Sequence, residues 1–128
     1  MKIIGGTAGG RRLATPEKRS SRSGPGRRGE LIRPTSALAR EALFNILGPA
    51  VADGEVADLY AGSGALGLEA LSRGARSALF VDLTRQAVNL IHENIDRCGF
   101  GDRARVVKRD LARGLFFCPP WLRPAASP

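Results

Sequence analysis

Apolar residues follow two different spacings along the chain, and the two spacings alternate from about residue 55 onward. Short apolar runs predict strands over residues 56–60, 78–82 and 104–108. Between these runs, apolar positions three and four apart predict helices over residues 65–73 and 85–97. Strands that alternate with helices favour right-handed parallel crossovers in a three-layer α/β sheet.

The first half of the chain is patterned differently. Short runs at residues 2–4 and 11–14 flank the sequence GGTAGG and predict a β-hairpin over residues 1–15. Residues 16–32 are rich in serine, glycine and arginine and predict a basic flexible loop. A helix is then expected, with Thr35 as its N-cap and with Gly48 and Pro49 at its end. Its apolar face contains Ala39, Ala42, Leu43, Ile46 and Leu47.

The helix predicted over residues 85–97 contains a polar residue to which we assign no chemical role. Its core stripe consists of Val88, Ile91, Ile95 and Cys98. His92, the only histidine, lies beside that stripe, which favours a place on the helix surface over a catalytic role. Cys98 and Cys118 lack the spacing of metal ligands, so we expect reduced, structural thiols and no metal site.

The charge of the chain is concentrated at one end. The formal net charge is +8, and residues 1–40 hold ten basic against two acidic residues, so the remainder is neutral. A basic arm on a neutral domain indicates a polyanionic partner, most often a nucleic acid, with a solvated disordered tail as the alternative. The candidate RNA-binding residues are Arg11, Arg12, Lys18, Arg19, Arg22, Arg27 and Arg28. Because no membrane span or secretory signal is visible, we expect a cytoplasmic location.

The sequence DLYAGSGALGLEA, residues 58–70, joins a predicted strand to a predicted helix through a glycine turn. Glycines are needed where a ligand lies against bare backbone and where φ is positive, and the first amides of the helix are unpaired donors. The candidate cofactor-binding residues of the turn are Ala61, Gly62, Ser63 and Gly64. Gly62, Gly64 and Gly67 also match the letters of the dinucleotide fingerprint, so NAD is an alternative ligand.

Three acids follow three successive predicted strands. Asp58, Asp82 and Asp110 are expected to meet at one crevice, because the ends of adjacent parallel strands share an edge. Asp82 can accept from the ribose hydroxyls and Asp110 from an adenine amino group. Asp58 lies four residues before Gly62, where it would repel a pyrophosphate and attract the amino group and sulfonium of S-adenosylmethionine. For each acid the alternative role is helix capping or a solvated strand end.

Three segments together resemble one family. IIGGTAGGRRLATP (3–16), RPTSALAREALFNILGP (33–49) and DLYAGSGALGLEALSRGA (58–75) are similar to the bacterial 16S ribosomal RNA (guanine-N2)-methyltransferases, and the likeness extends to about residue 110. The resemblance implies a Rossmann-like domain that transfers the methyl group of S-adenosylmethionine to the exocyclic amine of a guanine in 16S ribosomal RNA or the small ribosomal subunit.

The resemblance also assigns individual residues. It implies that Gly62, Ser63 and Gly64 pack beneath the methionine and ribose, that Asp82 binds the ribose, and that Asp110 binds the adenine. Arg33 and Thr35 match a segment near the methionine end of the cofactor, or else they cap and fix the helix that begins there.

The family's acceptor motif, Asp/Asn-Pro-Pro-Tyr/Phe, is missing. The nearest segment is FFCPPW, which makes Cys118, Pro119, Pro120 and Trp121 weak catalytic candidates, because a thiol is a poor acceptor and no crossover helix fits before it. We therefore expect residues 33–128 to form an incomplete domain, truncated or disrupted after about residue 110, with an exposed strand edge through which the chain self-associates. The alternatives to an active methyltransferase are a non-catalytic RNA-binding fragment and, less favoured, an NAD-dependent oxidoreductase.

Overall fold

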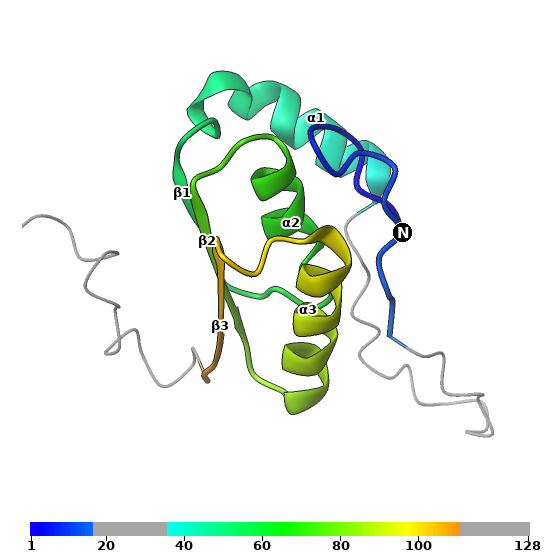
Figure 1. Cartoon of the computed structure of the whole chain (residues 1–128), viewed down its shortest axis with the longest axis vertical. Coiled ribbons are helices and arrows are strands. Elements are labelled where there is room, and N and C mark those ends of the chain that lie inside the picture. Colours follow the sequence, from blue (N-terminus) through cyan, green and yellow to red (C-terminus); the bar gives the residue numbers. More distant parts are fainter. Residues whose placement is uncertain (17–35, 111–128) are drawn as a thin grey trace, which may run out of the picture.

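The computed structural model of the 128-residue chain describes residues 1–16 and 36–110 (Figure 1). The described elements, in chain order, are α1 (Ala37–Leu47), the 3-10 helix η1 (Gly48–Ala50), β1 (Glu55–Asp58), α2 (Ala65–Ser72), β2 (Ser77–Asp82), α3 (Arg85–Cys98) and β3 (Ala104–Lys108). The alternation of strands and helices predicted from the sequence is confirmed. None of the helices described is long and apolar enough to span a membrane.

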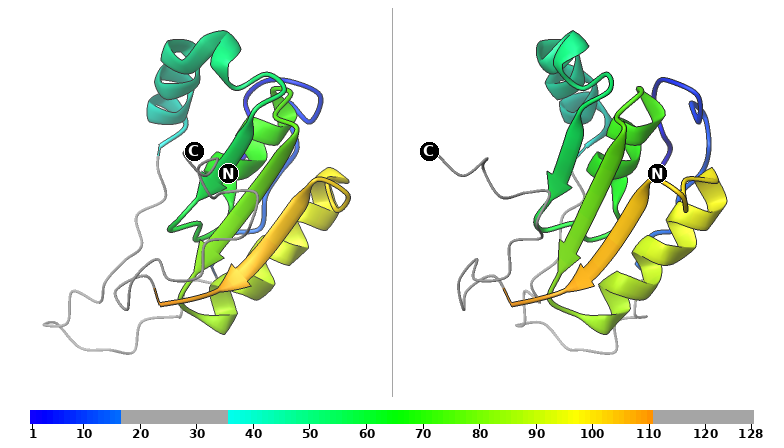
Figure 2. Two further views of the ribbon diagram at one scale, coloured as in Figure 1. Left: turned by 90° about the vertical axis from the view of Figure 1, so that its left-hand side faces the viewer. Right: turned by 60° about the vertical axis from the view of Figure 1, so that its left-hand side comes forward.

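The three described strands are parallel and lie side by side in the order β1-β2-β3. Helices α2 and α3 cover the same face of this sheet, as Figures 1 and 2 show. Two right-handed crossovers that each step one strand in the same direction place both helices on one face. The described residues therefore form two layers, where the sequence pattern favoured three.

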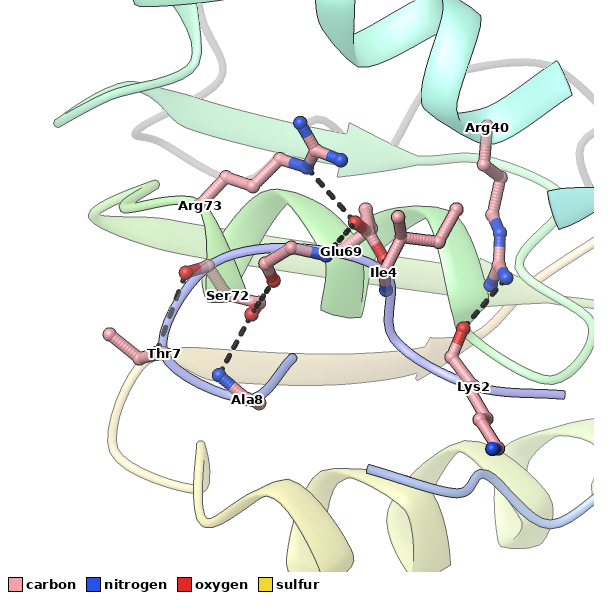
Figure 3. Close-up of polar contacts among 9 residues, drawn as sticks. Lys2, Ile4, Thr7, Ala8, Arg40, Glu69, Ser72 and Arg73 are labelled. Atoms are coloured by element: carbon pink, nitrogen blue, oxygen red, sulfur yellow. Dashed lines mark hydrogen bonds and ion pairs between the residues drawn. The ribbon is translucent and has the colours of Figure 1, made fainter. Parts of the chain in front are cut away.

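Helix α1 departs from its predicted boundaries and from its predicted apolar face. Ser36, not Thr35, is the N-cap, and its side chain accepts a hydrogen bond from the Ala39 amide at 3.1 Å. The buried residues of α1 are Arg40 and Phe44, whereas Ile46 is 82% exposed. The predicted stripe was wrong because the helix packs through a different face, on which Arg40 donates from Nη2 to the Lys2 carbonyl oxygen at 2.8 Å (Figure 3).

The N-terminal segment, residues 1–16, pairs with itself as predicted, but it contains only an isolated antiparallel bridge between Lys2 and Arg12. The backbone of this segment forms hydrogen bonds instead with side chains of α2 (Figure 3). Glu69 accepts from the amides of Ile4 and Gly5 at 2.9 and 3.0 Å, and Ser72 Oγ accepts from the Ala8 amide at 2.9 Å. These side chains supply the hydrogen bonds that a neighbouring strand would otherwise provide.

The core lies between the sheet and its two helices, and at Gly67 the backbone of α2 packs closely against Phe80 of β2. Replacing Gly67 with alanine is expected to lower the free energy of unfolding by about 1–3 kcal/mol, because the new Cβ would overpack the core. That atom would lie 2.3 Å from Cε1 of the fully buried Phe80. Urea denaturation followed by circular dichroism measures the change.

Gly101→Ala is the matched control for this substitution. A Cβ at Gly101 would have no neighbour within 4 Å. As a surface change it is expected to alter stability by less than about 0.5 kcal/mol. Equal effects of the two substitutions would contradict the close contact between α2 and Phe80.

Candidate functional site

The carboxyl ends of the three strands bring Asp58, Asp82 and Asp110 to one edge of the sheet. Asp58 ends β1, Asp82 ends β2, and Asp110 follows β3 by two residues. Asp58 pairs with Phe80, and Asp82 pairs with Lys108, so each acid lies two residues beyond the partner of the preceding one. The acids thus form a stepped row across the end of the sheet, in the order that the sequence predicted.

Asp58 is the buried member of this row. It is 9% exposed, and its Oδ2 accepts from the Gly67 amide, one of the free donors in the first turn of α2, at 3.2 Å. Burial raises the pKa of Asp58, and the charge of Asp82 raises it further, although the backbone amides of Gly67 and Tyr60 oppose the shift. A carboxylate in this position favours a cationic neighbour, because such a neighbour would restore the interactions that burial removes.

The glycine turn between β1 and α2 is fixed from both sides. Gly62 and Gly64 have φ values of 55° and 84°, in the left-handed region that favours glycine. The Gly62 amide donates to Asp82 Oδ2 at 2.9 Å, and Asn94 Nδ2 of α3 donates to the Ser63 carbonyl at 2.8 Å. Gly64, the N-cap of α2, makes no side-chain capping bond, and the Asp58 carboxylate accepts instead from the Gly67 amide in the first turn of the helix.

Apolar side chains flank the acids at the same edge. Tyr60, two residues after Asp58, is 82% exposed, and Leu83, next to Asp82, is 56% exposed. Exposed residues of this size beside polar groups suit a flat apolar ligand such as a nucleobase. Sequence reasoning placed Tyr60 inside a strand and missed both Leu83 and Asn94. The available signal for Leu83 was a large apolar residue directly after a strand-end acid.

The remaining predicted residues divide into two groups. Within the described chain, Arg11 and Arg12 are exposed, and Arg11 Nη1 donates to the Arg97 carbonyl at 2.9 Å. His92 is on the helix surface and Cys98 is a buried free thiol, as predicted. Residues 1–16 and 36–110 contain no group of three or more His, Cys, Asp or Glu side chains arranged to hold a metal ion. The predicted site residues that lie outside the described ranges are Lys18, Arg19, Arg22, Arg27, Arg28, Arg33, Thr35, Cys118, Pro119, Pro120 and Trp121.

Comparison with known proteins points to one group. The chain is 41% identical over 107 residues to ribosomal RNA small subunit methyltransferase D of Escherichia coli, which covers 84% of this chain and 48% of that protein. The protein of the same name from Haemophilus influenzae is 34% identical, with coverages of 85% and 51%. A solved Escherichia coli structure superposes with a TM-score of 0.70 at 38% identity, covering 86% of this chain and 53% of that one.

These matches define both the extent of the likeness and the fold. The chain spans about half the length of the curated relatives it matches. Its parallel sheet with covering helices has a Rossmann-like methyltransferase fold. Residues 1–116 match the model of the family described as conserved hypothetical protein 95, and the chain belongs to that family.

Proposed function

We propose that this chain forms the cofactor-binding half of an S-adenosylmethionine-dependent methyltransferase that modifies the exocyclic amine of a guanine in 16S ribosomal RNA. The observation that carries the proposal is the buried Asp58 beside a glycine turn whose first amide is held by Asp82. The curated relatives, which bear the name ribosomal RNA small subunit methyltransferase D, support the substrate class.

Charge favours S-adenosylmethionine over a dinucleotide. Desolvation already raises the pKa of Asp58, and a pyrophosphate nearby would add further negative charge beside this buried carboxyl group. The amino group and sulfonium of S-adenosylmethionine would instead stabilise the Asp58 carboxylate. The residues present therefore fit this cofactor better than NAD.

Each remaining part of the cofactor has a proposed contact. The backbone from Ala61 to Gly64 lies under the methionine and ribose, and Asp110 accepts from the adenine amino group. Asp82 is proposed to bind a ribose hydroxyl through Oδ2, which accepts one hydrogen bond, from the Gly62 amide, and has a second lone pair available. Oδ1 already accepts from the amides of Leu83 and Thr84. Arg33 and Thr35 are proposed to contact the methionine end.

The bound cofactor supplies an electrophilic methyl group, and the task of the protein is to align it. A guanine amine is a weak nucleophile, so the rate depends on holding its nitrogen in line with the methyl carbon. The guanine must be unstacked to reach that position. Exposed Tyr60 offers a stacking surface beside the turn, and Cys118 to Trp121 stay weak candidates for the acceptor side.

The basic residues of the N-terminal segment are proposed to bind the RNA backbone. Arg11 and Arg12 are exposed there, next to the basic stretch of residues 16–32. Phosphate contacts of this kind contribute affinity without sequence specificity and weaken as the salt concentration rises. The proposed partner is 16S ribosomal RNA or the small ribosomal subunit.

Calorimetric titration tests the cofactor assignment. The wild-type chain is expected to bind S-adenosylhomocysteine and not NADH, and Asp82→Ala is expected to weaken that binding about tenfold or more, as the loss of hydrogen bonds to a charged group predicts. Asp96→Ala, which removes an exposed acid from α3, is the charge-matched control and should bind like wild type. Unchanged affinity in Asp82→Ala would refute the ribose contact.

The activity itself is tested with small ribosomal subunits and S-adenosylmethionine labelled on its methyl group. Transfer of label to a guanine supports the complete proposal. Cofactor binding without transfer would favour the non-catalytic RNA-binding fragment. Failure of the folded wild-type protein to bind S-adenosylhomocysteine would reject the cofactor assignment altogether.

A further inference from the structure

Asn94 of α3 joins two segments that are far apart in the sequence. Its side chain is fully buried. Nδ2 donates to the Ser63 carbonyl at 2.8 Å and to the Ala14 carbonyl at 3.0 Å, while Oδ1 accepts from the Ala14 amide at 2.6 Å. One amide group thus connects the glycine turn of the proposed cofactor site to the end of the N-terminal segment.

The two bonds to Ala14 fix the orientation of the Asn94 amide. Since the Ala14 amide needs an acceptor, Oδ1 must face the N-terminal segment, and Nδ2 is then left facing the carbonyls of Ala14 and Ser63. Both hydrogens of Nδ2 have acceptors, so the buried group is satisfied. If the N-terminal segment left its place, the two bonds to Ala14 would be lost and only the bond to Ser63 itself would orient the Asn94 amide.

The Ser63 carbonyl is a point at which the turn needs support. The flanking Gly62 and Gly64 both have positive φ, and glycines adopt many backbone conformations at little cost. Asp82 holds the amide of Gly62 from the side of β2, and Asn94 holds the carbonyl of Ser63 from the side of α3. Together they select one orientation of the peptide groups that a cofactor would meet.

A second contact links the same turn to the N-terminal segment. The Ser63 hydroxyl donates to the Met1 sulfur at 3.6 Å. The segment is itself docked in the core through Ile3, Ala8 and Leu13, which are each no more than 5% exposed. The turn is therefore ordered by a segment that also carries the exposed Arg11 and Arg12.

We propose that Asn94 is a positioning residue that keeps the glycine turn ready for the cofactor and couples this state to docking of the N-terminal segment. The proposal rests on the cofactor site proposed above and assigns to Asn94 no contact with the cofactor. Because the exposed Arg11 and Arg12 lie on the same segment as Ala14, RNA bound to them would stabilise the docked segment and thereby favour cofactor binding.

Titration of Asn94→Ala with S-adenosylhomocysteine tests the proposal. The folded variant is expected to bind about five- to tenfold more weakly than wild type, as the loss of a supporting hydrogen bond predicts. Ile95→Ala is the matched control, because Ile95 is a buried neighbour on α3 whose loss destabilises the core. Its folded form should bind within about twofold of wild type, since it leaves the hydrogen bonds of Asn94 in place.

A double-substitution cycle tests the coupling to the N-terminal segment. Leu13→Ala loosens that segment beside Ala14 and is expected to weaken cofactor binding as Asn94→Ala does. If both act through one bridge, the double variant binds no more weakly than either single variant. Additive losses would overturn the coupling, and wild-type affinity in Asn94→Ala would overturn the positioning role.

The proposed cofactor site and the proposed role of Asn94 would be rejected by different results. Absence of S-adenosylhomocysteine binding by the wild-type protein rejects the proposed function, whereas binding that is equal in wild type and Asn94→Ala rejects only the role of Asn94. If Asn94→Ala does not fold, the side-chain amide signal of Asn94 in the wild-type protein provides the measurement by nuclear magnetic resonance. It is expected to shift on addition of S-adenosylhomocysteine, and an unchanged signal would contradict the proposal.

Discussion

Replacing Glu69 with alanine is expected to lower the free energy of unfolding by about 3–5 kcal/mol, the range found when one partner of a buried charged pair is removed. The Glu69 side chain is fully buried, accepts from the amides of Ile4 and Gly5, and pairs with Arg73 Nε at 2.9 Å. Without it, two backbone donors and a guanidinium lose their acceptor at once (Figure 3). Urea denaturation followed by circular dichroism gives the change in stability.

Glu93→Ala provides a control with the same local geometry. Glu93 pairs with Arg97 at 2.8 Å, also one helical turn away, but both side chains are about half exposed. Exposed pairs of this spacing contribute about 0.3–0.5 kcal/mol, so this variant should be nearly as stable as wild type. Similar losses in the two variants would mean that the backbone contacts of Glu69 contribute little to docking of the N-terminal segment.

The sheet and its two covering helices were predictable because their signals are local. The apolar runs around Phe80 and Val106 and the helical spacing of Ile91 and Ile95 each appear within a few residues of sequence. The same signals did not reveal which face of α1 packs inward. Phe44 and Arg40 are buried there, and burial of Arg40 depends on the carbonyl of Lys2, 38 residues away.

Docking of the N-terminal segment could not be predicted from the sequence pattern for a similar reason. Glu69, Ser72 and Asn94 are polar residues on helices, and polar residues at such positions are usually solvated. Each is instead buried and bonds a backbone amide 64 to 80 residues away. A hydrophobic pattern cannot distinguish a buried polar side chain with a distant partner from an exposed one.

The candidate site could be predicted from the sequence only in part. The glycine turn is a contiguous motif, and the row of acids follows from the order of strands in a parallel sheet, so both were predicted. The structure adds that Asp58 and Asp82 also bond the backbone of α2 and of the turn. Capping and cofactor binding therefore do not exclude each other, because the same carboxylate can accept hydrogen bonds from the backbone and from a ligand.

Asp58→Asn is expected to weaken S-adenosylhomocysteine binding about ten- to hundredfold at neutral pH, the range for hydrogen bonds to charged groups. The proposed reason is the loss of the negative charge that faces the cofactor's amino group. In wild type the affinity should rise with pH, because the cofactor binds the ionised form of Asp58, whose pKa burial raises. The variant should lose this pH dependence. Calorimetric titrations at several pH values measure both effects.

The same substitution is expected to act in the opposite direction on stability. Since the pKa of Asp58 is raised in the folded state, its contribution to stability is fully present below its ordinary pKa and is lost as the pH rises through the folded value. Asp58→Asn removes that loss, so its stability relative to wild type should increase as the pH rises above the ordinary pKa of an aspartate. Glu55→Gln makes the same charge change at the exposed start of β1 and should alter neither the pH dependence nor the affinity. Loss of affinity without the relative gain in stability would show that burial does not destabilise the ionised form of Asp58. The carboxylate would then contribute to the site only by contacting the cofactor.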